Sequence, residues 1–293
     1  MTTSYASQSR FTDPRAMSWW LDDIPTDLPG MHAAAAGLVF HYTAHGDITE
    51  HGFAAKRVRE IDLRYADDLL TRLHELNPAP PGSDRVPTDR VVGCCRDSAL
   101  LLVAMARHHG IPARARVGFA KYLMPDWTMD HVVAEVWDQH ESRWRLVDPQ
   151  FTEHKLLDVL DVPRDMFLTG PHAWQACRSG AADPSRFVVS PDRPEPDLRG
   201  WPQLTHNLIQ DLAALNKHEM LLWDIWGLLA EEPGDPDELA MKLDGLAALL
   251  HSDDVAPEQI SDLFEDTTVR VPEAVITISP AGLAPARILL RAN

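Results

Sequence analysis

Three residue types that act together in nucleophilic catalysis follow one another along the middle of this sequence. Two adjacent cysteines, Cys94 and Cys95, are followed by His131 and then by Asp148. A thiol attacks a carbonyl carbon as its thiolate, a histidine can take up the thiol proton, and a carboxylate can orient the histidine. This order predicts a cysteine nucleophile with a general base and a residue that orients the base.

The two cysteines directly precede an apolar segment, residues 99–106, which is predicted to be a buried helix that stops at Gly110. A helix N-terminus favours a thiolate, and its free N–H groups can also bind an oxyanion. Adjacent side chains in the first turn diverge by about 100°, so only one of the two cysteines can face a cleft. The alternative is that both are small buried residues that pack the start of the helix.

The histidine and the aspartate fall in two segments with strand-like composition, residues 131–137 and 144–148, after a further predicted strand at 113–119. If the turn between them places Trp137 opposite Ser142, His131 lies opposite Asp148, and the carboxylate can hold the imidazole N–H. This interpretation depends on the register, because a slip of one residue moves Asp148 to the neighbour of His131. The alternative is a structural or solvated histidine, one of 14 in the chain.

Four segments in order resemble the core of the transglutaminase-like superfamily. They are Gly93-Cys-Cys-Arg-Asp-Ser-Ala99, His109-Gly-Ile-Pro-Ala-Arg114, Asp130-His-Val-Val-Ala-Glu-Val136 and Trp144-Arg-Leu-Val-Asp-Pro149. The resemblance covers about residues 90–151. It implies an α+β fold with a transglutaminase-like or papain-like core, in which a central helix packs on a small antiparallel sheet, and helical additions are expected at both ends.

The resemblance also implies roles for individual residues. Cys95 is the expected nucleophile because it directly precedes Arg96-Asp97, with His131 as the base and Asp148 as its orienting residue. Cys94 departs from the pattern, since many relatives have valine or another apolar residue there. No glutamine lies between Gln8 and Gln139, so a papain-style glutamine for the oxyanion is absent and the second oxyanion donor is not identified.

Outside this core the sequence predicts mainly helices. We expect them at residues 27–42 and 65–76 and, after a proline-rich stretch at 190–202, at residues 201–217, 219–230 and 237–250. Two β-prone runs, 267–278 and 288–290, are not assigned to a sheet. The predicted organisation is a transglutaminase-like domain with an N-terminal helical elaboration at 1–195, and a mostly helical C-terminal region at 196–293 that packs on it.

The composition limits the partners and the compartment. A net charge of −17 argues against binding of nucleic acid or anionic membranes. Residues 211–266 hold fifteen Asp and Glu against two Lys, which indicates a solvated acidic face or, alternatively, a dock for a basic partner. Three cysteines are too few for a disulfide framework, and the first fifteen residues lack a signal-type apolar stretch, so we expect free thiols and a cytoplasmic location. No metal-ligand spacing appears, and neither a metal nor a cofactor is predicted.

The leading functional prediction is a cysteine-dependent acyl-transfer enzyme that acts on a peptide, another amide or a thioester. Analogy with bacterial members of the superfamily favours a hydrolase, and the alternative is an amide-forming acyltransferase. A third possibility is a binding module that keeps the fold but separates Cys95 from His131 and buries Cys95; a fourth is an interaction scaffold built on the acidic helices. Trp127, Trp137 and Trp144 flank the strands of the triad and are candidates for substrate binding. The oligomeric state is left open.

Overall fold

The computed structural model describes residues 3–44, 46–230, 235–251 and 255–292. The helices in this part of the chain are α1 (Leu28–Ala36), α2 (Ala66–Leu76), α3 (Cys95–His108), α4 (Gly170–Arg178), α5 (Gly200–Leu215), α6 (Pro236–Leu250) and α7 (Pro257–Leu263). The strands are β1 (Val39–His41), β2 (Val91–Gly93), β3 (Ala113–Ala120), β4 (Thr128–Asp138), β5 (Arg143–Val147), β6 (Phe167–Thr169), β7 (Phe187–Val188), β8 (Asp224–Ile225), β9 (Ala274–Thr277) and β10 (Ala286–Leu289). Short 3-10 turns connect many of them.

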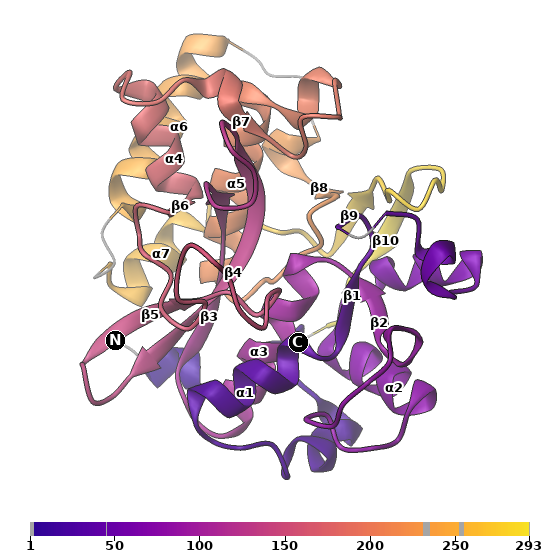
Figure 1. Cartoon of the computed structure of the whole chain (residues 1–293). Helices are drawn as coiled ribbons and strands as arrows, with labels where there is room; N and C mark the ends of the chain where they lie inside the picture. Colours follow the sequence, from indigo (N-terminus) through magenta and orange to yellow (C-terminus); the bar gives the residue numbers. More distant parts are fainter. Residues whose placement is uncertain (1–2, 45, 231–234, 252–254, 293) are drawn as a thin grey trace.

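A five-stranded sheet and the helix α3 form the centre of the molecule (Figure 1). The strand order is β5-β4-β3-β6, all antiparallel, and β7 pairs in parallel with the start of β4. Helix α3 packs on β4 and β3, with α1 and α2 against it, whereas α5 packs on β3 and is followed outward by α4 and α6. The fold is therefore α+β, with a central helix on a small antiparallel sheet, as the sequence predicts.

The burial pattern explains why these segments form these elements. Every residue from Ala99 to Ala106 is buried, so α3 is surrounded on all sides and needs no polar face. The helix ends as predicted: Gly110 adopts a positive φ of 73°, and the N–H of Ile111 donates to the carbonyl of Ala106 at 2.9 Å. Strand β3 is buried along its whole length because helices and neighbouring strands cover both of its faces.

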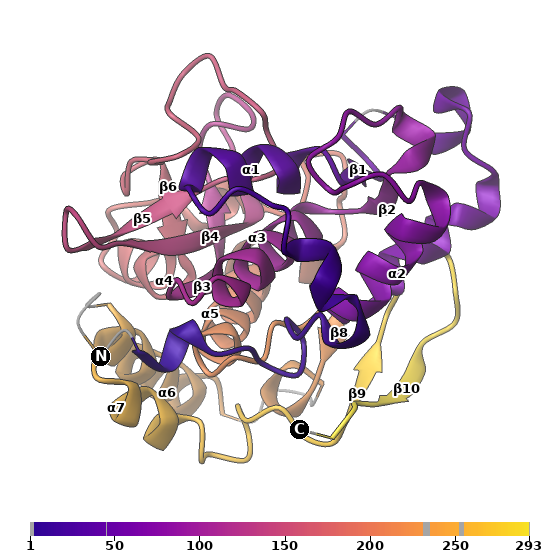
Figure 2. The same cartoon turned by 90° about the horizontal axis from the view of Figure 1, so that it is seen from below.

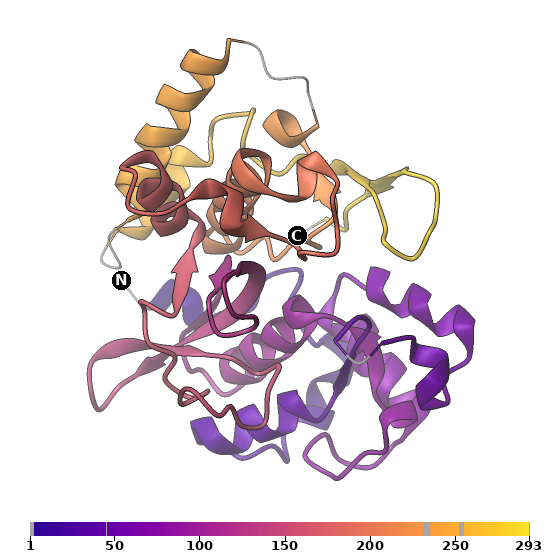
Figure 3. The same cartoon turned by 45° about the horizontal axis from the view of Figure 1, so that its top comes forward.

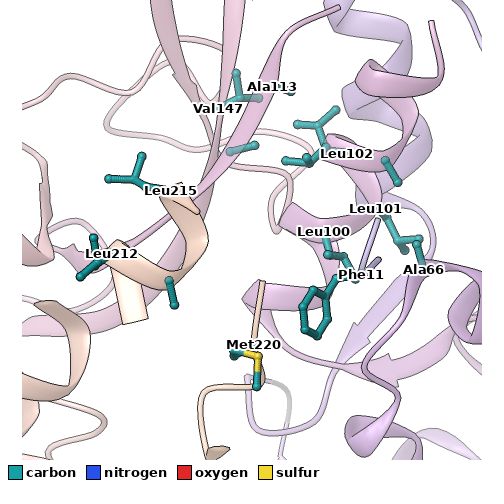
Figure 4. Close-up of a cluster of buried hydrophobic side chains, with 14 of the residues drawn as sticks. Phe11, Ala66, Leu100, Leu101, Leu102, Ala113, Val147, Leu212, Leu215 and Met220 are labelled. Atoms are coloured by element: carbon teal, nitrogen blue, oxygen red, sulfur yellow. The ribbon is translucent and has the colours of Figure 1, made fainter. Parts of the chain in front are cut away.

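One hydrophobic core joins distant parts of the chain. Figure 4 shows members of this cluster from the N-terminal segment, α2, α3, the sheet, α5 and the segment after α5; the labelled residues are Phe11, Ala66, Leu100, Leu101, Leu102, Ala113, Val147, Leu212, Leu215 and Met220. The cluster extends to Leu290 near the end of the chain. The domain boundary between residues 195 and 196 stays a prediction. A common core is expected for a single domain and equally for a C-terminal region that packs on a first domain.

Two small sheets complete the fold. Strands β1 and β2 pair in parallel, and β8, β9 and β10 form an antiparallel sheet. Figure 2 shows β9 and β10 on the same side of the molecule as α2. There the guanidinium of Arg291 binds the carboxylates of Asp67 and Asp68, each at 2.7 Å. Figure 3 shows the indigo and purple N-terminal segments on one side of the central sheet and the orange C-terminal helices on the other.

The structure corrects two predicted helices. The first helix ends at Ala36, and the chain then forms β1, because Val39 and Phe40 pair with Val91 and Val92 of β2. Residues 219–230 contain no α-helix but a turn, strand β8 and a 3-10 turn at Gly227–Leu229. The buried carboxylate of Asp224 accepts the N–H of Leu221 at 3.3 Å and stabilises this turn.

The other C-terminal predictions are confirmed in type. Residues 201–217 and 237–250 correspond to α5 and α6, and the β-prone runs contain β9 and half of β10. Within the described residues, no helix has the length and apolar character needed to cross a lipid bilayer.

Candidate active site

Helix α3 begins at Cys95 because Asp97 caps it. The Oδ2 atom of Asp97 accepts the N–H of Cys94 at 2.9 Å, and its Oδ1 atom accepts an N–H of Arg96 at 3.0 Å. Gly93 makes room for this carboxylate, since a Cβ at position 93 would lie 2.6 Å from Asp97 Oδ2. The Gly-Cys-Cys-Arg-Asp segment therefore places Cys95 at the first helical position, where backbone N–H groups lack partners within the helix.

The buried Arg96 attaches a C-terminal loop to the same place. Its guanidinium donates to the carbonyl oxygens of Arg64, Glu219 and, at 3.2 Å, Met220. The segment after Met220 packs against the cysteines, so Arg96 positions part of the wall of the site through this segment.

His131 and Asp148 are in direct contact. The Nε2 atom of His131 lies 2.8 Å from Asp148 Oδ2, and both side chains are buried. Asp148 is itself fixed, because the hydroxyl of Tyr122 donates to Oδ2 at 2.7 Å and the N–H of Gln150 donates to Oδ1 at 3.0 Å. With Nε2 occupied by the carboxylate, Nδ1 is the ring nitrogen of His131 that remains for another partner.

The predicted register of these strands is wrong, although the contact it predicted is present. Trp137 pairs with Trp144 and not with Ser142, and the ladder between β4 and β5 ends at Ala134 and Val147. The observed pairing is shifted by two residues from the predicted one. A shift of two residues keeps the side chains on the same face of the sheet, so Asp148 still reaches His131 as a diagonal neighbour.

The thiol of Cys95 has three side-chain hydrogen-bond partners, namely Cys94, His131 and His41. The hydrogen bond with Cys94 and the positive charge of His131 outweigh burial and hold the pKa of Cys95 well below its usual value. Burial alone would lower the pKa of His131, but the charges of Asp148 and Cys95 raise it to about 10. Both shifts favour the thiolate–imidazolium form of the pair.

The two adjacent cysteines are not equivalent. The hydrogen bond to Cys95, together with burial, raises the pKa of Cys94 well above the usual value, so the Cys94 thiol stays protonated and donates a hydrogen bond to the neighbouring sulfur. The asymmetry agrees with the implication of the family pattern that Cys95 is the reactive residue. Cys177 on α4 is a free buried thiol whose pKa is raised to about 11 by burial, and it is not part of this group.

Apolar and aromatic side chains enclose the thiolate. Cys94 and Cys95 form a buried cluster with residues of α3, β3, β4 and α5, and the side chains of Tyr42, Leu222 and Trp223 pack against it. Tyr42 and Trp223 are in edge contact, with ring centroids 6.4 Å apart. Only 5% of the surface of Cys95 is exposed.

A carboxyl group borders the site beside His131. Asp130 accepts an N–H of Asn207 at 2.8 Å, and burial together with the nearby Cys95 charge raises its pKa to about 7. Since Asn207 lies on α5, the C-terminal part of the chain contributes to this border as well.

The structure places the three candidate tryptophans in different surroundings. Trp137 and Trp144 contact each other, with ring centroids 5.5 Å apart, and Trp137 lines a separate pocket with Leu28 and Ile111. Position 137 lies six residues along β4 from His131, which is about 20 Å, so the substrate-binding role of these two tryptophans stays a prediction that this separation does not favour. Trp127, below the guanidinium of Arg186, precedes β4 directly, and its substrate-binding role stays a prediction.

Sequence reasoning missed several residues around the thiol, above all His41, Tyr42, Tyr122 and Trp223. No motif marks them, because they reach the site through strand pairing and loop packing and not through spacing along the chain. Among the described residues, no group of three or more His, Cys, Asp or Glu is arranged to hold a metal ion.

A comparison with protein-family models finds a match over this core. Residues 55–149 match the family model of the transglutaminase-like superfamily. A search of solved structures found a crystal structure from Cytophaga hutchinsonii named a "putative cysteine protease", at 16% sequence identity and a TM-score of 0.36. That alignment covers 57% of this chain and 45% of the other, so the chain spans less than half of that structure. Among curated proteins none matches the chain.

The fold and the site together are those of a cysteine-type enzyme. Its core, residues 55–149, is transglutaminase-like.

Proposed function

We propose that this protein is a cysteine-dependent acyl-transfer enzyme in which Cys95 is the nucleophile, His131 the acid–base residue and Asp148 the residue that orients His131. The observation that supports this most strongly is the 2.8 Å contact between His131 Nε2 and Asp148, beside a Cys95 thiol whose pKa is lowered by Cys94 and His131. The substrate class is a peptide, another amide or a thioester, because a thiolate exchanges acyl groups with such carbonyl compounds.

The proposed reaction has two halves. The Cys95 thiolate attacks the carbonyl carbon, a C–S bond forms, and the carbonyl π electrons move to oxygen. The tetrahedral intermediate then collapses, the bond to the leaving amine or thiol breaks, and the imidazolium of His131 protonates the leaving group. Water or an amine, deprotonated by His131, attacks the thioester in the second half and restores the thiolate.

Hydrolysis and acyl transfer differ only in the second acceptor. We favour hydrolysis, acting as a peptidase or amidase, in keeping with the sequence analysis. The amide-forming alternative is favoured by one observation, the apolar cover of Tyr42, Leu222 and Trp223 that limits the access of water to Cys95. A non-catalytic binding module is disfavoured, since Cys95 and His131 are within hydrogen-bonding reach, although the burial of Cys95 agrees with it.

Trapping of an acyl-enzyme tests the proposal. Incubation with p-nitrophenyl acetate followed by peptide mass mapping is expected to place one acetyl group on Cys95. The C95A variant should not be acetylated at the site, whereas the matched C94A variant should be acetylated more slowly because Cys95 loses a hydrogen bond. Acetylation of neither vicinal cysteine, or only of Cys177, would contradict an activated thiol at Cys95. Adding glycinamide and measuring whether the acetyl group reaches water or the amine separates the two acceptors.

A further inference from the structure

His41 lies beside Cys95 although it is far away in the sequence. Strand β1 pairs in parallel with β2, with His41 opposite Gly93, and the N–H of Tyr42 donates to the carbonyl of Gly93 at 2.9 Å. Since Gly93 is two residues before Cys95, the end of β1 brings the imidazole to the N-terminus of α3. The His41 ring is within hydrogen-bonding reach of the Cys95 sulfur.

The backbone next to His41 fixes which ring nitrogen carries the proton. Nδ1 accepts the N–H groups of Thr43 and Ala44 at 3.3 and 3.2 Å. A ring nitrogen that accepts a backbone N–H presents its lone pair, so in the neutral imidazole the proton is on Nε2. His41 is thereby a hydrogen-bond donor toward Cys95 through Nε2, whereas the Nε2 of His131 is bound to Asp148.

The acyl-transfer reaction needs such a donor. The oxygen of the tetrahedral intermediate becomes negative, and the backbone N–H of Cys95 at the start of α3 supplies one hydrogen bond to it. No upstream glutamine supplies a second: Gln8 donates to the carbonyl of Ala104, toward the other end of α3. The nearby side-chain donors of Trp223 and Asn207 are bound to carboxylates, Asp62 at 2.9 Å and Asp130 at 2.8 Å.

We propose that His41 is a further catalytic residue, whose Nε2–H donates a hydrogen bond to the oxyanion formed when Cys95 attacks the substrate carbonyl. The inference rests on the proposed function. In the resting enzyme the thiolate accepts this hydrogen bond. In the intermediate the sulfur is bonded to carbon, the negative charge is on oxygen, and the donor turns to that oxygen. His41 keeps its proton throughout, and the leaving group is protonated by His131.

Two reactions of the same sulfur separate this role from a role in forming the thiolate. Alkylation by iodoacetamide displaces iodide at a tetrahedral carbon and creates no oxyanion, whereas acylation by p-nitrophenyl acetate does. Both rates are measured at Cys95 over a range of pH and compared on their plateaus, where a change in thiolate fraction no longer matters. For H41A we expect acylation to fall by about 10²- to 10³-fold and alkylation to stay close to the wild-type rate.

H41Q keeps an N–H group at the end of the side chain and is expected to recover part of the acylation rate. H140A, the same change at an exposed histidine of the hairpin between β4 and β5, is the control and should match the wild type. Slow labelling of the buried Cys177 verifies that each variant is folded.

Wild-type acylation in H41A would overturn the role of His41 and leave the proposed function intact. Equal losses of acylation and alkylation would also overturn it, because His41 would then act on access or on the thiol. A wild-type protein that alkylates at Cys95 but is never acylated there would overturn the proposed function and this inference with it.

Discussion

Two histidines act on one thiolate, and each is held in place by different partners. His131 is raised to a pKa of about 10 despite its burial because it lies between the charges of Asp148 and Cys95. His41 is oriented by its own backbone turn, since its Nδ1 accepts the N–H groups of Thr43 and Ala44. Cys94, the residue that departs from the family pattern, donates a third hydrogen bond to Cys95. This hydrogen bond stabilises the negative charge of the thiolate and so lowers the pKa of Cys95.

The pH dependence of Cys95 alkylation follows from these shifts. Because the pKa of Cys95 is lowered, its iodoacetamide rate should be nearly flat between pH 7 and 8.5, where an ordinary thiol gains about tenfold per unit below its pKa. D148N removes the charge that stabilises the imidazolium, so the thiolate fraction at pH 7 should fall and the profile should move to higher pH. A wild-type rate that climbs tenfold per unit over this range would contradict the thiolate–imidazolium pair.

Strands β3 and β4 are joined by a buried group of charges. Glu135 accepts hydrogen bonds from Arg114 at 2.6 Å, Arg116 at 3.1 Å and Arg164 at 2.8 Å. Arg116 also binds Asp211 of α5 at 2.8 Å. Each charged side chain in this network has an oppositely charged partner. The network joins the sheet that holds His131 to the C-terminal helix α5. Asp211 is buried, so not all of the acidic residues at 211–266 that were predicted to form a solvated face are on the surface.

Glu135 is expected to contribute to stability in a pH-dependent way. Burial would raise its pKa, but Arg114, Arg116 and Arg164 lower it below the value of about 4.3 in the unfolded chain. A depressed folded pKa stabilises the fold above the unfolded pKa, and this contribution is lost as the pH falls through the folded pKa. E135Q should therefore lower the free energy of unfolding at pH 7 by about 3–5 kcal/mol, and the difference from wild type should narrow below about pH 4.

Urea unfolding measures this effect, and E141Q is its matched control. Glu141 pairs with Arg143 on the exposed hairpin, where an ion pair contributes about 0–1 kcal/mol. If E135Q is no more destabilising than E141Q, the buried network is not a stabilising feature of the sheet.

At the scale of the whole molecule, the N-terminal and C-terminal segments meet around α3. The hydroxyl of Tyr5 donates to the carbonyl of Leu215 at 2.8 Å, and Arg107 near the end of α3 binds Glu219 at 2.9 Å. With the shared hydrophobic core, these contacts connect the part of the chain before residue 195 to the part after it.

We therefore expect α3 and α5 to unfold together. Hydrogen exchange with mass spectrometry at increasing urea should show the amides of Cys95–His108 and Gly200–Leu215 losing protection at the same denaturant concentration, in one cooperative transition. Earlier exchange of α5 while α3 stays protected would instead show that the C-terminal region is an independent unit.

Local sequence determined the parts of this protein that depend on neighbouring residues. The apolar run before Gly110 predicted α3 and its end, the alternation after it predicted β3, and the Cys95, His131 and Asp148 pattern predicted the contacts at the thiol. The helix and the strand follow from periodicity, capping and composition, which act over a few residues. The contact of His131 with Asp148 was instead predicted from a family pattern and an assumed strand register.

Tertiary structure alone decided what depends on distant segments. Residues 38–40 lie next to or in a strand and not in a helix because β1 pairs with β2. The register of β4 and β5 depended on the turn that joins them. The turn at 219–230 depended on contacts of Arg64, Arg96 and Asp224. The positions of His41 and Trp223 beside Cys95 likewise depend on strand pairing and packing across the fold. Such contacts bring together residues with no fixed spacing, so no pattern in a single sequence specifies them.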